Sequence, residues 1–434
     1  MIAAIGHVPF MQSEAVSVSI KSDAVKKMKL MVAIVKQTPE LAEVQQLLKE
    51  MLEQSKAQQR GFSIVTESFE NQPSRKHYKQ YAANGIGLII FISSSHPKTI
   101  EWRIYDTQNA SMIKGKRFST EGYSARTIAE YMADQLWPLL TGQKGFFSTR
   151  IAYCKHIRSG KKMQKHIYVT QPYRDIRRSD DQAKLLVDST NAFAPRWNYD
   201  AQDPLILYSE IGKANIRLMS VSLDKKRKLV ANLEGMTTSA SFSKDGKKVV
   251  YCSADGSLHG NSNIFLYHFD PHNSKPMVYQ ITNNQANNVS PILCDNGDII
   301  FCTDAGSKNP YICCYKADTG IIERITFDGY ASSPAYCAQS KMIAYSRNCN
   351  GVMQIFVYDC VAKTHAQITF DNAHKEQSSW SPCGNYLAFT QDDGKTTRIA
   401  VHHIISGERV FLTSADERCS YPTWSPAYDK PMVV

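Results

Sequence analysis

The chain has 434 residues, enough for two or three domains, because a single hydrophobic core rarely serves more than about 250–300 residues. Hydrophobic residues make up 43% and charged residues 21%, values close to globular averages that exclude a disordered or collagen-like chain. No run of about 18 apolar residues occurs, so the sequence predicts no transmembrane helix and no direct membrane insertion.

Positive charge is concentrated in one short part of the chain. The formal net charge is +11, and between residues 146 and 185 Lys and Arg outnumber Asp and Glu by ten to three. Such a stretch either meets an acidic partner or an anionic surface, or it forms a solvated basic face, and the sequence leaves both open. Aromatic residues are not interleaved with the basic ones as a base-stacking platform requires, so we expect no nucleic-acid partner.

The first 145 residues alternate strand and helix patterns. Residues 1–15 are mildly apolar without a basic start, which predicts either a leader or a disordered N-terminus. Residues 16–20 alternate apolar and polar side chains as a strand does, and residues 30–35 form a buried-strand run. Thr38-Pro39-Glu40 is typical of a helix start. Apolar residues follow it at helical spacing: Leu41, Val44, Leu47, Leu48 and Leu52.

Further strands and a long helix complete this region. Strand patterns cover residues 62–65 and 86–92, and a hairpin pattern covers residues 102–105 and 112–118. Residues 125–140 carry a helical apolar stripe, with Gly142 just past its end. The sequence therefore predicts an α/β domain over residues 16–145.

The rest of the chain repeats with a period near 44 residues. An anchor residue recurs at intervals of 45, 51, 43, 44 and 44, at Trp197, Phe242, Leu293, Tyr336, Trp380 and Trp424. A second marker, Ile-Thr or Leu-Thr, begins at residues 281, 325, 368 and 412. Each unit contains four short strand patterns separated by turn residues, which is typical of a β-propeller blade.

The two ends of the repeat region complement each other. Residues 150–153, 166–170 and 184–187 supply three strand patterns without an anchor strand, and residues 421–426 supply an anchor strand without followers. Together they make one blade, in which the C-terminal strand is the innermost and closes the ring. The sequence predicts an N-terminal α/β domain followed by a six-bladed β-propeller over residues 146–434, closed by the C-terminal strand.

Reactive side chains form no recognisable catalytic pattern. No nucleophile elbow, zinc-binding helix, Walker loop or dinucleotide-binding glycine motif occurs, so we expect no catalytic residues, no metal and no cofactor. The adjacent His402 and His403 fall on a strand and diverge. Eleven cysteines begin at Cys154, and we interpret most as small core residues, leaving disulfide pairing unassigned.

Two stretches resemble the TolB family of the bacterial Tol–Pal system. They are WRIYDTQNASMIKGKRFS at residues 102–119 and LLTGQKGFFSTRIAYC at residues 139–154, and the blade repeats are similar to the Ser-Pro-x-Trp-Ser-Pro-Asp-Gly blades of that family. The resemblance covers residues 14–426. It implies a monomeric, non-enzymatic periplasmic adaptor with a signal peptide, which supports outer-membrane integrity and cell division.

The resemblance also implies two binding surfaces. Pal, the peptidoglycan-associated lipoprotein, is expected at the mouth of the propeller channel, on loops that lead into the innermost strands. The residues expected there are Met236, Thr237, Thr238, Ser239, Asn288, Val289, Ser290, Tyr330, Ser332, Glu376, Gln377 and Tyr421. TolA is expected to bind the N-terminal segment by strand addition through Glu14, Val16, Val18 and Ile20. Other outer-membrane proteins are further candidate partners.

Several alternatives remain open from the residues alone. The channel loops are also explained as plain connections between blades, and the N-terminal segment as a strand of its own domain. A propeller scaffold with diverged envelope partners is the runner-up function. A nucleic-acid binder that uses the basic stretch, and a peptidase-type propeller, are the other classes considered.

Overall fold

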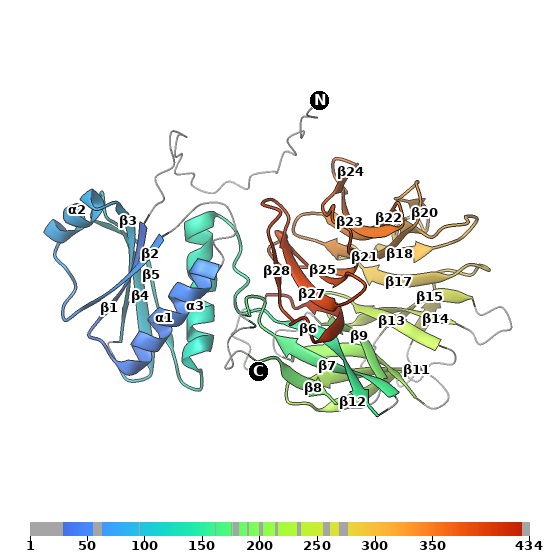
Figure 1. Cartoon of the computed structure of the whole chain (residues 1–434), viewed down its shortest axis with the longest axis horizontal. Coiled ribbons are helices and arrows are strands. Elements are labelled where there is room, and N and C mark those ends of the chain that lie inside the picture. Colours follow the sequence, from blue (N-terminus) through green and yellow to red (C-terminus); the bar gives the residue numbers. More distant parts are fainter. Residues whose placement is uncertain are drawn as a thin grey trace.

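The computed structural model describes residues 29–54, 63–94, 96–160, 162–174, 176, 182–188, 191–198, 203–212, 216–231, 236–254, 261–268 and 277–427. A small α/β unit and a propeller lie side by side (Figure 1). The expected strand over residues 16–20 and the expected leader over residues 1–15 lie outside the described residues.

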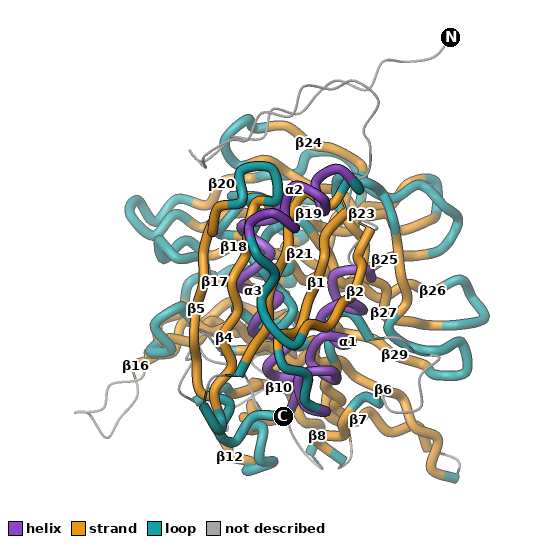
Figure 2. Tube along the Cα trace, turned by 90° about the vertical axis from the view of Figure 1, so that its left-hand side faces the viewer, coloured by secondary structure: helices purple, strands orange, loops and turns teal. Residues whose placement is uncertain are grey.

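The α/β unit is a five-stranded sheet covered by helices on both faces. Its strand order is β2-β1-β3-β4-β5. Strand β1 pairs in parallel with β2 and β3, whereas β4 pairs antiparallel with both β3 and β5. The strands are β1 (Lys29–Val35), β2 (Ser63–Phe69), β3 (Ile86–Ser93), β4 (Thr99–Asp106) and β5 (Ser111–Ser119). The helices are α1 (Pro39–Gln54), α2 (Arg75–Ala83) and α3 (Ala125–Thr141). Helices α1 and α3 cover the face toward the propeller, and α2 covers the other face (Figures 1 and 2).

The predicted helices begin and end where their terminal residues indicated. Helix α1 begins at Pro39, and the hydroxyl of Thr38 accepts a hydrogen bond from the Leu41 amide at 3.3 Å. Helix α3 is followed by Gly142 in the left-handed conformation, with φ of 73°, which glycine adopts without strain. Helix α2 was not predicted, because its nine residues carry no apolar stripe and Tyr78 is its main buried side chain.

Within the described residues, the remaining strands form six four-stranded antiparallel blades. Blades 4, 5 and 6 are separate sheets, and blades 1, 2 and 3 are joined into one twelve-stranded sheet by single parallel pairings of Lys165 with Asn191 and of Ile216 with Met236. Blade 1 contains β29 (Arg418–Trp424), β6 (Ile151–Ser159), β7 (Lys162–Thr170) and β8 (Lys184–Val187). Blade 2 contains β9 (Asn191–Trp197), β10 (Leu205–Ile211), β11 (Ile216–Ser222) and β12 (Arg227–Ala231). Blade 3 contains β13 (Met236–Phe242), β14 (Lys248–Ala254), β15 (Ser262–His268) and β16 (Met277–Gln280).

The last three blades follow the same order from the innermost strand outward. Blade 4 contains β17 (Asn288–Leu293), β18 (Ile299–Thr303), β19 (Tyr311–Tyr315) and β20 (Ile322–Arg324). Blade 5 contains β21 (Ala331–Cys337), β22 (Met342–Cys349), β23 (Val352–Asp359) and β24 (Thr364–Gln367). Blade 6 contains β25 (His374–Trp380), β26 (Tyr386–Asp392), β27 (Thr397–His403) and β28 (Arg409–Phe411).

The C-terminal strand closes the propeller, as the sequence predicted. β29 pairs with β6 from Arg418 opposite His156 to Trp424 opposite Ile151. Just beyond this register, the amide of Ser425 donates to the carbonyl of Arg150 at 2.8 Å. Closure pairs β6 with β29, so the second strand of blade 1 does not present an open edge toward the axis.

The repeated sequence markers have repeated structural roles. The threonine of each Ile-Thr or Leu-Thr pair accepts a hydrogen bond from a third-strand amide at 2.9–3.0 Å, in the pairs Thr282–Ile264, Thr326–Ile312, Thr369–Ile355 and Thr413–Ile399. Two of the three anchor tryptophans link neighbouring blades, because the indole of Trp197 donates to the Thr423 carbonyl and that of Trp380 to the Ala335 carbonyl, both at 3.1 Å.

The described cysteines are packing residues. None of the eleven forms a disulfide in the described structure, and eight are buried and three half-buried. Cys313 and Cys314 belong to two different hydrophobic clusters, which confirms that they face opposite sides of their strand.

The motif at residues 139–154 forms the junction between the two units. Phe146 and Phe147 stack with ring centroids 4.6 Å apart, and Phe146 also contacts Tyr386 of blade 6 at 4.8 Å. Across the same junction, buried Arg150 forms an ion pair with buried Glu130 of α3 at 2.9 Å. One hydrophobic cluster therefore runs from α1 and α3 into blades 6 and 1.

Candidate partner-binding site at the channel mouth

Every innermost strand carries a β-bulge at the same place. Its register with the second strand of the blade shifts at this point in all six blades. In five of them the bulge contains a residue with φ between 52° and 59°, namely Ala194, Ser290, Ser333, Gln377 and Tyr421. A bulge redirects a side chain out of the regular alternation. The segments expected to be loops therefore lie largely within the innermost strands.

The six bulges surround one central cavity of about 310 Å³. Residues from all six innermost strands line it: Phe193, Ala194, Arg196, Ser239, Val289, Ser290, Ser333, Pro334, Gln377, Ser378 and Tyr421. Hydroxyl, amide and guanidinium groups dominate this lining. The cavity is thus a polar socket on the propeller axis.

Five residues predicted from the sequence meet in this cavity: Ser239, Val289, Ser290, Gln377 and Tyr421. The Gln377 side-chain oxygen accepts from the Tyr421 amide at 2.9 Å and from the Thr390 hydroxyl at 2.8 Å, which fixes both bulges. Arg196 and Pro334 were missed, because Arg196 follows a bulge and Pro334 lies within one, and the sequence does not show where the register shifts.

Four other predicted residues lie beside the cavity. Tyr330 is 40% exposed, Glu376 and Ser332 are half-buried, and Asn288 is fully buried. The backbone of Met236, Thr237 and Thr238 lies in β13, while their side chains are outside the described set. Glu14, Val16, Val18 and Ile20 also lie outside the described residues.

Asn288 holds the connection between β16 of blade 3 and β17 of blade 4. Its amide nitrogen donates to the Ala286 carbonyl at 3.2 Å and to the Asn284 side chain at 2.7 Å. Two blades further on, Lys375 takes the same place, and its ammonium group donates to the Ala373 carbonyl and the Asp371 carboxylate. Both donors are fully buried, so the segments entering the innermost strands are held rigidly.

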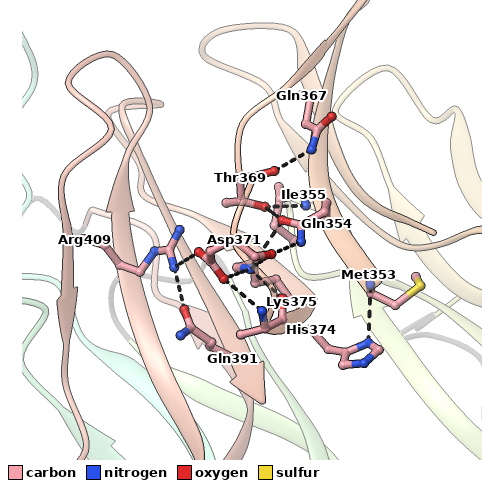
Figure 3. Close-up of polar contacts among 11 residues, drawn as sticks. Met353, Gln354, Ile355, Gln367, Thr369, Asp371, His374, Lys375, Gln391 and Arg409 are labelled. Atoms are coloured by element: carbon pink, nitrogen blue, oxygen red, sulfur yellow. Dashed lines mark hydrogen bonds and ion pairs between the residues drawn. The ribbon is translucent and has the colours of Figure 1, made fainter. Parts of the chain in front are cut away.

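The Lys375 site is a closed polar network (Figure 3). Arg409 donates to Asp371 and to Gln391, both at 2.7 Å, so two cations share one carboxylate. Burial raises the pKa of Asp371, but hydrogen bonds from Lys375 and Arg409 outweigh it and bring the value to about 2. Burial lowers the pKa of Lys375 while Asp371 opposes that shift. The network holds the segment before β25 in place, although the buried Nε of Arg409 has no hydrogen-bond partner among the described residues.

Comparison with known proteins identifies the family. The TolB β-propeller domain family matches residues 137–428, more than half of the chain. The chain belongs to the TolB family. The "Tol-Pal system protein TolB" of Francisella tularensis is 22% identical over 367 residues, which is 80% of this chain and 80% of that protein.

Solved structures share the fold of this TolB-family chain. TolB from Acinetobacter baumannii superposes with a TM-score of 0.72 at 20% identity, covering 92% of this chain and 97% of that chain. Hydrazine synthase from Kuenenia stuttgartiensis superposes with a TM-score of 0.53 at 13% identity, over 67% of this chain and 48% of that one.

Charge is distributed unevenly around the mouth of this TolB-family chain. On blade 1, the Lys165 ammonium lies 5.8 Å from the Phe193 ring centroid and 5.5 Å from that of Tyr421. On blade 6, burial raises the pKa of half-buried Glu376. Burial also raises the pKa of Tyr421, with Glu376 adding to the shift and Arg196 opposing it.

The cavity lining is suited to binding. Among the lining residues that the structure describes there is no carboxylate, imidazole or thiol to pair with a hydroxyl as base or nucleophile. Within the described ranges no three His, Cys, Asp or Glu side chains lie together as a metal site. In the same ranges no helix is both long and apolar enough to span a bilayer.

Proposed function

We propose that this TolB-family chain is a periplasmic adaptor of a Tol–Pal system that makes no covalent change to its partners. It binds the globular domain of a Pal-like lipoprotein at the channel mouth. It thereby supports outer-membrane integrity and constriction at cell division. The observation that carries the proposal is the convergence of six bulged innermost strands on one rigid polar socket, in a chain that belongs to the TolB family.

Rigidity is what makes the mouth suitable for docking. A preformed surface loses little conformational entropy when a partner binds. Buried Asn288 and Lys375 hold the segments beside the mouth, and the Gln377 side chain locks two bulges together. The exposed Tyr330 supplies an aromatic contact of the kind enriched at interfaces.

A second partner is proposed for the N-terminal segment. We assign residues 1–15 to a leader or a disordered N-terminus, residues 16–145 to the α/β domain and residues 146–434 to the propeller. A TolA-like inner-membrane protein binds through Glu14, Val16, Val18 and Ile20 by strand addition. The buried junction between α3 and blades 1 and 6 gives a physical route by which the two sites affect each other. Such coupling is reciprocal in binding free energy.

The Pal-binding half is tested with Ser290→Glu. Ser290 lines the cavity, so a longer charged side chain fills the socket without disturbing a buried contact. We expect the affinity for the Pal globular domain of the same organism, measured by calorimetry, to fall about tenfold or more. Ala338→Glu is the matched control, because Ala338 lies in the turn between β21 and β22, at the end of blade 5 away from the channel mouth.

The thermal midpoint must stay nearly unchanged in both variants. An equal loss of folding in Ser290→Glu, or unchanged Pal affinity, contradicts a docking role for the socket. Deleting residues 1–25 is expected to abolish TolA binding and to spare Pal binding, and retention of both in pull-downs contradicts the N-terminal assignment.

A further inference from the structure

Lys165 is a cation beside the channel mouth that forms no ion pair with any residue the structure describes. It is half-buried on β7, and no described carboxylate lies within ion-pair distance of its ammonium group. Its backbone pairs with Asn191, the first residue of β9, which places it at the end where the innermost strands begin. The two rings beside it, Phe193 and Tyr421, both line the cavity.

The cavity next to Lys165 contains polar groups suited to an oxyanion. Arg196 lines it and brings a second positive charge. Ser378 also lines it, is 3% exposed, and its hydroxyl has no hydrogen-bond partner. A buried hydroxyl without a partner is costly, and such groups are normally satisfied by a protein atom, water or ligand.

We propose that the channel mouth binds a carboxylate, supplied by an acidic side chain of the docked protein partner, on the side formed by Lys165 and Arg196. This inference deepens the proposed function and rests on it. Charge-assisted hydrogen bonds from an ammonium or guanidinium to a carboxylate are about twice as strong as neutral ones. The two rings beside Lys165 partly remove it from water, which strengthens its attraction to an incoming anion.

A negative group on the neighbouring blade 6 helps to set the orientation of the partner. Glu376 on blade 6 makes no hydrogen bond or ion pair with a described residue, and it repels a second carboxylate. An acidic partner group is therefore directed away from Glu376 and toward Lys165 and Arg196. Charge complementarity of this kind fixes the register of a complex and excludes wrong partners.

The test uses the full chain and the Pal globular domain from the same organism, with affinity measured by calorimetry. Lys165→Met removes the charge and keeps most of the apolar stem, and we expect about a tenfold loss of affinity that shrinks at high salt. Lys165→Arg keeps the cation and is expected to bind within about threefold of the unmodified protein. Lys341→Met is the matched control, because Lys341 lies in the turn between β21 and β22, at the end of blade 5 away from the channel mouth.

Four outcomes are distinguishable. Loss in Lys165→Met, with near-normal binding by Lys165→Arg and Lys341→Met, supports the inference. Equal Pal affinity of Lys165→Met and the unmodified chain overturns it while the proposed function stands. Failure of the unmodified chain to bind Pal overturns the proposed function and this inference with it. Millimolar inorganic phosphate that binds the free chain and displaces Pal shows that a free anion occupies the site, which overturns the assignment to a partner side chain.

Discussion

The buried ion pair between Glu130 and Arg150 gives a strong test of how the two units are joined. Glu130 lies on α3 and is fully buried, while the Arg150 side chain, just before β6, is 5% exposed. The Tyr173 hydroxyl also donates to Glu130, and Arg150 donates to the Thr149 carbonyl at 2.9 Å. Burial lowers the pKa of Arg150, but Glu130 outweighs it and the net shift is upward.

The perturbation is Glu130→Gln, which preserves the shape and one acceptor but removes the negative charge. Breaking a buried pair from one side costs about 3–5 kcal/mol, because the remaining charge has no counter-ion. The retained amide acceptor keeps part of the hydrogen bonding, so we expect a loss of about 3 kcal/mol in the free energy of unfolding. The double variant Glu130→Met with Arg150→Met removes both charges of the pair and is expected to be more stable than Glu130→Gln.

Urea unfolding followed by tryptophan fluorescence measures this loss. The rings of Trp137 and Trp424 contact that of Phe146, with centroids 6.2 and 6.3 Å away, so their fluorescence reports on the junction. A loss below about 1 kcal/mol for Glu130→Gln, or a double variant no more stable than the single one, refutes the reasoning.

Two further predictions concern packing and pH. A Cβ at Gly145 would lie 2.5 Å from the Asp134 Cα, so Gly145→Ala should lower the free energy of unfolding by about 1–3 kcal/mol. At Gly306 a Cβ would meet no atom, so Gly306→Ala should cost only about 1 kcal/mol, because its φ is positive. Thermal midpoints of the two variants test this difference. His402 is 2% exposed with both ring nitrogens unpartnered, and burial lowers its pKa from 6.5 to about 4. As the pH falls, His402 therefore takes up a proton in the unfolded chain before it does so in the folded one. The stability that neutral His402 contributes is fully present above pH 6.5 and is lost as the pH falls toward about 4. His402→Phe should show a smaller drop in urea midpoint between pH 7 and pH 5, and an identical drop would contradict this.

Local sequence patterns predicted most of the architecture, because their physical causes are local. The period near 44 reflects recurring hydrogen bonds, such as that between Thr369 and the Ile355 amide, which lie within one blade. The closing role of residues 421–426 followed from counting strands, and β29 confirms it. Helix α2 escaped prediction because its helical state depends on packing of Tyr78 against Phe91 and Tyr105 in the sheet.

The candidate site was only partly predictable. Ser290 and Tyr421 were found through resemblance to a family. Arg196 and Lys165 were not, because nothing near them in the sequence marks them as neighbours of the axis. Lys375 shows that a residue beside the mouth need not contact a partner. Its ammonium group points into the protein and donates to the Ala373 carbonyl in the segment before β25.

The amino-acid sequence by itself determined the α/β unit, the six blades, the closing strand and the family, since each depends on side-chain periodicity or on residues close together in the chain. Only the tertiary structure decided which groups face the axis. A bulge shifts the side-chain alternation of every innermost strand, with a left-handed residue in five of them, and six such strands must meet before a shared cavity with Arg196, Ser378 and Tyr421 in its wall exists.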